Sequence, residues 1–160
     1  MIKKKEKRYR KKYEKRLNQI SLKIKEVLDM NIKSYFKKKG GFGVLSTADE
    51  KGKVNAAPYA SPHVIDDTHI AFIMSDRLSH AKKKKNPYAA YLFKERGFGY
   101  KGVRLYLKME RESDEQTLVK NTCKLTYPGP YCVERFLKGS FIVFFKVEST
   151  LPLIVDDTGK

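Results

Sequence analysis

The spacing of apolar residues along the chain changes at Gly40-Gly41. Before this pair, apolar side chains recur three or four positions apart, with Lys and Glu between them, at Leu17, Ile20, Ile24, Val27 and Leu28. Such spacing places them on one face of a helix. We therefore predict an amphipathic helix over 17–37, broken near 29–31 and ended by the two glycines.

After the glycines, short apolar or alternating segments predict strands. The predicted strands cover 43–47, 54–65, 69–75, 88–95, 102–111 and 140–147. Gly52 marks the tip of a hairpin turn over 49–53. Pro58 and Pro62 cannot donate to a strand ladder, so we expect 54–65 to lie at a sheet edge or to contain a bulge. The most hydrophobic segment, 140–147, should be central.

Helices are predicted between some of these strands. One covers 79–86 and is stopped by Pro87, another opens at Ser113 with the spacing of a capping box, and a helical turn is expected near 133–137. Together these elements predict a mostly β (α+β) fold, a six-stranded antiparallel barrel with peripheral helices. We divide the chain into a basic N-terminal extension, 1–30, and a barrel domain, 31–160.

Charge is concentrated at the N-terminus. The 160 residues include 41% hydrophobic residues, which suits one core, and carry a formal net charge of +17. Residues 1–39 hold 16 Lys+Arg and 4 Asp+Glu, whereas 40–160 hold 19 and 14. The segment 1–16 has almost nothing to bury and is expected to be an exposed arm, helical or disordered. Two interpretations stay open: an electrostatic clamp for nucleic acid or anionic lipid, or a solvated extension.

Composition argues against several other classes of protein. Uncharged apolar runs such as Phe141–Phe145 are far short of the ~20 residues of a membrane-spanning helix. The basic N-terminus is not followed by the apolar segment of a secretory signal. Cys123 and Cys132 are too few for a disulfide framework or, alone, for a metal site, so we predict a reducing cytoplasm and no metal.

One glycine pattern resembles a dinucleotide-binding motif but lacks the structure that the motif needs. Residues 97–102 match G-x-G-x-x-G, but a dinucleotide site requires a helix directly afterwards, and here the following residues alternate with period two. We predict a hairpin loop instead. His63, His69 and His80 are not spaced as metal ligands on one helix, and we interpret the first two as ordinary surface or hydrogen-bonding residues at strand ends.

The segment 74–87 has the chemistry of an anion site. A predicted strand ends at Ser75, Arg77 follows in the turn, Ser79 opens the short helix and Lys82 lies one turn further. A guanidinium, a hydroxyl and free helix N–H groups together suit a phosphomonoester. The alternative is a helix-capping serine beside a solvated lysine run.

Three stretches carry a family resemblance: GFGVLSTADEKGKVNAAPYASP, IAFIMSDRLSHAKKKKNPYAAYLF and GFGYKGVRLYLKMERE. In their order and spacing, over about 31–150, they resemble the pyridoxamine 5′-phosphate oxidase-like, FMN-binding split-barrel family. The resemblance implies a six-stranded split barrel that forms a homodimer with two FMN sites in its interface. It also implies an FMN-dependent oxidoreductase or an electron-transfer flavoprotein.

The resemblance also implies which residues surround FMN. It places the phosphate among Arg77, Ser79, His80 and Lys82. It places the ring beside Asn55, Ala56, Ala57, Pro58 and Tyr59. Met74, Ser75 and Asp76 would lie near the ring and the ribityl chain, and Tyr100 would approach the flavin of the partner chain.

The resemblance has limits, and other functions stay open. Residues 126–160 lack the Arg and His arrangement that binds pyridoxal phosphate in the full oxidases, so vitamin B6 oxidase activity is not carried over. One alternative is a non-enzymatic module that binds haem or a deazaflavin in the same barrel. The other is a nucleic-acid or anionic-surface binder that acts through the basic arm.

Overall fold

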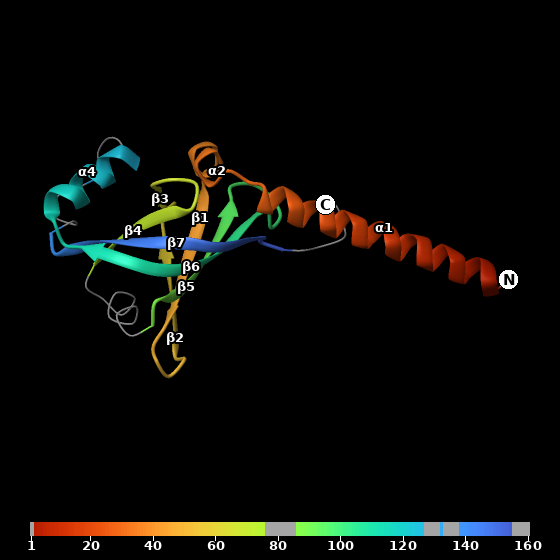
Figure 1. Cartoon of the computed structure of the whole chain (residues 1–160). Helices are drawn as coiled ribbons and strands as arrows, with labels where there is room; N and C mark the ends of the chain where they lie inside the picture. The colour runs from red at the N-terminus through yellow and green to blue at the C-terminus, as the bar shows by residue number, and fades with distance from the viewer. Residues whose placement is uncertain (1, 76–85, 127–131, 133–137, 155–160) are drawn as a thin grey trace.

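A single curled sheet dominates the structure, with helices at its periphery (Figure 1). The computed structural model describes residues 2–75, 86–126, 132 and 138–154. In chain order, the elements in these residues are α1 (Ile2–Leu28), α2 (Ile32–Lys38), β1 (Gly41–Ala48), β2 (Val54–Tyr59), β3 (His63–Val64), β4 (His69–Ser75), β5 (Tyr88–Glu95), β6 (Gly102–Ser113), α4 (Gln116–Thr126) and β7 (Ser140–Pro152). The predicted fold class, mostly antiparallel β in a half-barrel with peripheral helices, is confirmed.

The sheet has the strand order β2-β1-β5-β6-β7-β4-β3, and its ladders are all antiparallel. Its curl brings the two ends of this order together. The ring centroids of Tyr59 in β2 and Phe72 in β4 are 5.6 Å apart. The Tyr91 hydroxyl of β5 donates to the Ala60 carbonyl over 2.9 Å. Because these contacts close the sheet through side chains and not through strand pairing, the barrel is split.

The structure has seven strands where six were predicted. The extra strand arises because the segment predicted as one strand, 54–65, becomes β2 and β3 with a gap at 60–62. In the part of the chain that the structure describes, β2 pairs with β1 alone and β3 pairs with β4 alone, at the far end of the sheet order. Between β2 and β3 the chain crosses from one edge of the sheet to the other. Pro62 lies in this crossing, where its missing N–H group would interrupt a strand ladder. The predicted edge position of Pro58 is confirmed, and β7 is an interior strand.

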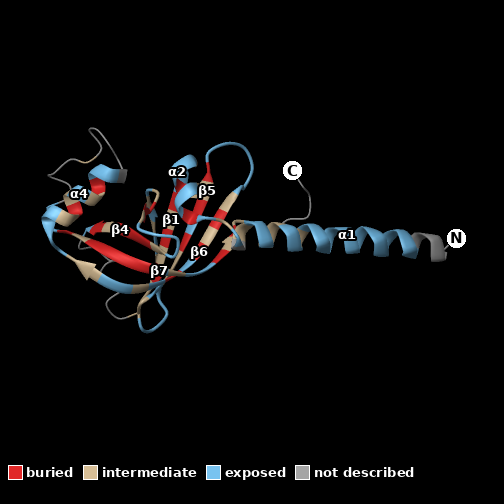
Figure 2. Cartoon of the chain, turned by 45° about the horizontal axis from the view of Figure 1, so that its top comes forward, coloured by how far each residue is buried: buried red, intermediate tan, exposed pale blue. Residues whose placement is uncertain are grey.

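Glycines in β1 make room for the aromatic core. A Cβ atom at Gly43 would overlap the Tyr91 ring and hydroxyl, and one at Gly41 would overlap the Lys94 carbonyl and the Phe93 ring. Tyr91 and Phe93 are fully buried. Figure 2 shows buried residues along β1, β4, β5, β6 and β7. The glycines of β1 thus leave the space that the large rings of β5 occupy in the core.

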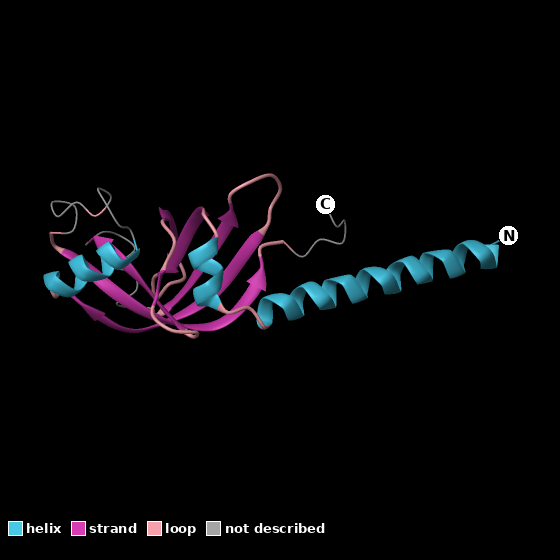
Figure 3. Ribbon diagram, turned by 90° about the horizontal axis from the view of Figure 1, so that it is seen from above, coloured by secondary structure: helices cyan, strands magenta, loops and turns pink. Residues whose placement is uncertain are grey.

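The N-terminal arm is helical. α1 runs from Ile2 to Leu28 and extends away from the sheet (Figure 3). The predicted break is confirmed at 29–31, after which the Asn31 side chain caps α2 by accepting a 2.8 Å hydrogen bond from the Ser34 N–H. α2 buries Ile32 and Phe36 in the core. None of the helices in the described residues has the length and apolar character that a membrane span requires.

α4 begins at Gln116, three residues after the predicted start. Ser113 ends β6, and its hydroxyl accepts a 3.2 Å hydrogen bond from the Glu115 N–H, which forms a turn just before the helix and not the predicted cap. Val119 packs on the sheet, but Leu125 is 86% exposed and does not continue the apolar face. The helix has turned by about 240° between these two residues, which directs Leu125 outward. The helices predicted over 79–86 and 133–137 lie outside the described residues.

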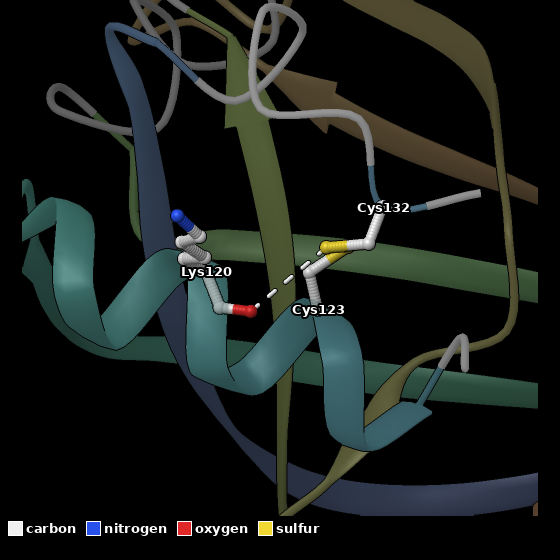
Figure 4. The surroundings of a disulfide bond; sticks show 3 residues. All are labelled: Lys120, Cys123 and Cys132. Atoms are coloured by element: carbon white, nitrogen blue, oxygen red, sulfur yellow. Dashed lines mark hydrogen bonds between the residues drawn. A yellow bond between two sulfur atoms is a disulfide. The ribbon is translucent and has the colours of Figure 1, made fainter. Parts of the chain in front are cut away.

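Cys123 of α4 and Cys132 form a disulfide, with Cα atoms 5.8 Å apart (Figure 4). The Cys132 sulfur also lies 3.9 Å from the Lys120 carbonyl. The two cysteines do not make a framework, as predicted, but they make one local cross-link that the sequence analysis did not anticipate. The predicted cytoplasmic location stays a prediction.

Gly43→Ala should destabilise the fold, because the added methyl group enters the space of a buried tyrosine. We expect a loss of about 2–4 kcal/mol from overpacking and from the weakened Tyr91–Ala60 hydrogen bond. Urea denaturation measures it. Gly40→Ala is the matched control, since its Cβ would meet nothing closer than the Arg96 side chain at 3.7 Å. Adding Tyr91→Phe should recover part of the Gly43→Ala loss. Equal stabilities of the two alanine variants would contradict this account.

Disulfide reduction should loosen α4. The cross-link closes a loop of sequence separation 9, for which chain entropy gives ~2–3 kcal/mol. Protein purified without reductant should expose no free thiol on denaturation, and two after reduction. Its urea midpoint should fall on reduction, while a Cys123→Ser/Cys132→Ser variant should be insensitive to reductant. Two reactive thiols in the unreduced protein would disprove the pairing.

Candidate functional site

β2 offers an open sheet edge. It pairs with β1 on one side, and Pro58 stands opposite Val44 in that ladder. A proline in an edge strand turns its nitrogen away from the partner strand. The backbone groups of alternate residues point to the same side of a strand, so Val54 and Ala56, like Pro58, direct theirs to the open edge. Unpaired backbone groups of this kind are a ready set of donors and acceptors.

β4 also has an open edge along its second half. β3 pairs with Ile70 and Ala71, and no strand of the described residues pairs with Phe72–Ser75 on that side. Met74 is fully buried in the core, so only its backbone is available to a ligand. Ser75 is exposed at the end of the strand. The structure therefore assigns the two predicted site residues in β4 different surroundings.

The two open edges diverge from the contact between Tyr59 and Phe72. In Figure 1, β2 runs from this contact toward the β1–β2 turn, and β4 runs toward Ser75. The segment 76–85 follows Ser75 in the chain and lies outside the described residues. The description resumes at Asn86, whose side-chain amide donates to the Asp49 carbonyl in the β1–β2 turn over 3.5 Å.

The structure thus brings Tyr59, at the end of β2, against Phe72 of β4, whereas the rest of β2 and the end of β4 diverge from this contact. We call this region, defined by 54–59 and 72–75, the split. The remaining predicted site residues lie outside the described residues: Asp76, Arg77, Ser79, His80 and Lys82. Their roles stay predictions.

Small side chains keep the β2 edge accessible. Ala56 and Pro58 are exposed, Asn55 and Ala57 are half-buried, and the Tyr59 ring packs against the core. With only a methyl group at two successive positions, a flat molecule meets little obstruction along this edge. The residues in β2 therefore fit a planar ligand.

Thr47 is a site residue that sequence reasoning missed. It lies opposite Asn55 in the β1–β2 ladder and is 2% exposed. Its hydroxyl has no hydrogen-bond partner among the described residues. An unpaired buried hydroxyl is a place where an ordered water or a ligand atom binds. No motif identifies it, because alternation in β1 predicts only that the side chain points inward.

The histidines near the split are structural. His63 of β3 is 5% exposed, which excludes the first of its two predicted roles, surface or hydrogen-bonding residue, and burial lowers its pKa to about 4. The hydrogen-bonding role predicted for His69 is confirmed: its Nδ1 lies 2.9 Å from an Asp66 carboxylate oxygen and its Nε2 lies 3.3 Å from Glu110. Bonds from the Thr68 backbone N–H and from the His69 side chain lower the pKa of Asp66 to about 2.

A cavity of about 750 Å³ lies at the opposite end of β5 from the split. It is bordered by α1, the loop between β5 and β6, and the end of β7. At its edge the Tyr35 hydroxyl donates to Glu95 over 2.9 Å, and the Lys39 ammonium lies 3.1 Å from the same carboxylate. Burial and the neighbouring Glu95 raise the pKa of Tyr35. Tyr100 borders this cavity and is 70% exposed, and its approach to a partner's flavin stays a prediction.

The glycine pattern over 97–102 forms the predicted hairpin loop. Gly97 and Gly99 have φ values of 121° and 75°, a region that favours glycine, and β6 follows directly. No helix follows to hold a pyrophosphate. The interpretation as a hairpin is confirmed, and the dinucleotide alternative is excluded at this position.

Comparison with known proteins identifies the fold. No protein-family model and no curated protein matches the sequence. A solved FMN-binding protein from Syntrophomonas wolfei subsp. wolfei matches with a TM-score of 0.65 and 19% identity, covering 87% of this chain and 94% of that chain. A structure described as F420 reductase matches with a TM-score of 0.61 and 15% identity, covering 73% and 94%.

A putative pyridoxamine 5′-phosphate oxidase from Lactobacillus delbrueckii is similar as well, with a TM-score of 0.55 and 14% identity, covering 77% of this chain and 91% of that chain. At these identities the likeness establishes the fold. The chain has the split-barrel fold of pyridoxamine 5′-phosphate oxidase-like, FMN-binding proteins. The resemblance seen in the sequence is thereby confirmed at the level of the fold.

His63 should make the fold sensitive to mild acid. Unfolded histidine titrates near 6.5 and folded His63 near 4, so the unfolded state takes up the proton first. Stability should be full above pH 6.5 and fall as the pH drops toward 4, by ~3 kcal/mol in total. Urea denaturation of wild type and His63→Gln at pH 7.5 and 4.5 isolates this contribution. An identical pH dependence in both proteins would contradict it.

Proposed function

We propose that this protein is an FMN-binding flavoprotein, an oxidoreductase or electron-transfer protein that acts as a homodimer. The observation that carries the proposal is the split. Two open strand edges diverge there, and the sequence that follows β4, 76–85, contains the residues best suited to a terminal phosphate.

The phosphate end of the proposed site uses charge. Arg77 has paired donors for a dianion, Ser79 offers a short hydrogen bond, and His80 and Lys82 follow within one helical turn of sequence. Charge-assisted hydrogen bonds are stronger than neutral ones, so this group would supply much of the affinity. The adjoining Ser75, exposed at the end of β4, lies where the ribityl chain would pass.

The ring end uses backbone. The polar edge of an isoalloxazine alternates hydrogen-bond acceptors with a donor, and the N–H and C=O groups of Val54 and Ala56 at the open edge complement such a pattern. Small side chains at Ala56 and Ala57 would let the ring approach. The unpaired Thr47 hydroxyl behind Asn55 adds a polar atom that a bound water or ligand would satisfy.

Similar structures support the choice of cofactor class. The structures described as FMN-binding and as F420 reductase share this fold, and both names refer to flavin-type chemistry. Bound FMN would supply hydride or electron transfer, and the protein would bind and orient it. The positive charges of Arg77 and Lys82 would stabilise negative charge on the ligand. A homodimer would cover the ring where one chain leaves the split open.

The proposal is tested first by the ligand itself. Purified protein should show a flavin absorption spectrum, mass spectrometry of the released ligand should give FMN, and native mass spectrometry should give a dimer. A haem spectrum, a deazaflavin, or no uptake of FMN at saturating concentration would contradict the proposal.

Arg77→Gln should weaken FMN binding while sparing riboflavin. Loss of a charged hydrogen bond costs ~1.5–3 kcal/mol, so the FMN dissociation constant should rise about 10- to 150-fold. Riboflavin has no phosphate, and its affinity should change little. Lys84→Gln is the matched control, because it removes one positive charge from the same segment at a position that is not among those predicted to surround the phosphate. Equal losses for FMN and riboflavin would show that Arg77 does not contact the phosphate.

A further inference from the structure

α1 has an apolar stripe that runs along one face. The stripe consists of residues three or four positions apart, Tyr9, Tyr13, Leu17, Ile20, Ile24 and Val27. With 3.6 residues per turn, this spacing keeps them within about 80° of one another around the helix axis. The stripe therefore extends the apolar face predicted over 17–28 by two more turns toward the N-terminus.

Only the C-terminal half of the stripe is covered by the chain itself. Val27 packs against the core, Ile20 and Ile24 are half-buried, and α1 contacts β7. In contrast, Tyr9, Tyr13 and Leu17 are 74%, 63% and 48% exposed. Figure 2 shows most of α1 as exposed. The face that packs on the domain at one end is therefore unpartnered at the other.

Basic residues border the exposed part of the stripe and cover the opposite face of α1. Residues 2–28 contain 12 Lys+Arg and 3 Asp+Glu. On the helix, Lys11, Lys12 and Lys15 all lie at least 100° from Tyr13, and each is exposed. Arg10 borders the stripe and pairs with Glu14 over 3.2 Å. An apolar stripe with tyrosines, bordered by strong positive charge, is the design of helices that lie in a membrane interface.

We propose that α1 binds the surface of an anionic phospholipid bilayer, with the stripe facing the acyl chains and the basic residues at the headgroups. Tyrosine suits this depth, because its ring is apolar and its hydroxyl remains hydrated. Lysine and arginine stems lie along the apolar surface while their charges reach the phosphates. The N-terminal part of α1, 2–19, is roughly 27 Å long, which is enough for several headgroup contacts.

Charge and the stripe together favour lipid over other occupants. A second copy of this chain offers no complementary charge, because residues 29–160 still hold 23 Lys+Arg against 15 Asp+Glu. Nucleic acid would complement the charge, but phosphate binding needs no stripe that includes Leu17 and continues into Ile20 and Ile24. A bilayer complements both features at once.

The absence of tryptophan from the sequence allows a direct test. Tyr13→Trp places a single indole on the stripe. Leu22→Trp is the matched control, because Leu22 is 62% exposed on the same helix but lies on the opposite side from Tyr13. With vesicles of phosphatidylglycerol and phosphatidylcholine, the indole emission of Tyr13→Trp should move to shorter wavelength and be quenched by brominated acyl chains. The emission of Leu22→Trp should do neither, and phosphatidylcholine vesicles should change neither variant.

Charge removal gives the second readout. Each basic residue near an anionic surface is worth about fivefold in affinity, so Lys11→Gln/Lys12→Gln/Lys15→Gln should weaken vesicle binding about a hundredfold. The control removes three exposed lysines from the domain, Lys124→Gln/Lys138→Gln/Lys146→Gln, and should bind within a few-fold of wild type. Circular dichroism establishes that α1 remains helical in both.

Three outcomes would overturn the proposal. If the Tyr13→Trp variant bound to vesicles without a change in its indole emission, the helix would be adsorbed by charge alone. Emission of the same variant already at short wavelength without vesicles would place the stripe between copies of the chain. Failure to bind anionic vesicles, with tight and salt-sensitive binding to a duplex of about 20 base pairs, would identify nucleic acid as the partner.

Discussion

The barrel depends on one buried side chain crossing between strands. Tyr91 passes over Gly43, where a Cβ would block it, and its hydroxyl holds the Ala60 carbonyl at 2.9 Å. The centroid of its ring lies 4.9 Å from that of the Phe72 ring in β4. Tyr91 thus contacts both the end of β2 and β4, which lie on opposite sides of the split. Aromatic contact closes the barrel at this end only, so the strands separate beyond it. The split is thus a result of how the core is packed.

The proposed site follows from the same constraint. Strand pairing would have consumed the backbone groups of β2 and of the second half of β4, but closure through Tyr59 and Phe72 leaves them available. The fold therefore leaves neutral donors and acceptors along both edges of the split. The sequence that follows β4 contains Arg77 and Lys82, which suit the anionic tail of the proposed ligand.

Much of this was predictable from local pattern. β4 and β5 have the predicted limits, 69–75 and 88–95, because bounded apolar segments determine strands almost independently of context. The hairpin loop at 97–102 was predictable because the residues after its glycines alternate with period two, which is typical of a strand. Three features were not: the change of edge after β2, the unpaired Thr47 hydroxyl, and the pairing of Cys123 with Cys132. Each depends on which distant strands or loops become neighbours, and periodicity does not encode that.

The junction between arm and domain turns a small angle into a large displacement. Asn31 caps α2 and also donates from its side-chain amide to Asp67 over 2.6 Å, so the domain side of the junction is clamped to the β3–β4 turn. α1 is a rigid rod of 27 residues, about 40 Å long. A tilt of about 10° at 29–31 would swing its tip by roughly 7 Å. A partner that binds α1 would consequently fix the orientation of the whole barrel, including the direction in which the split faces.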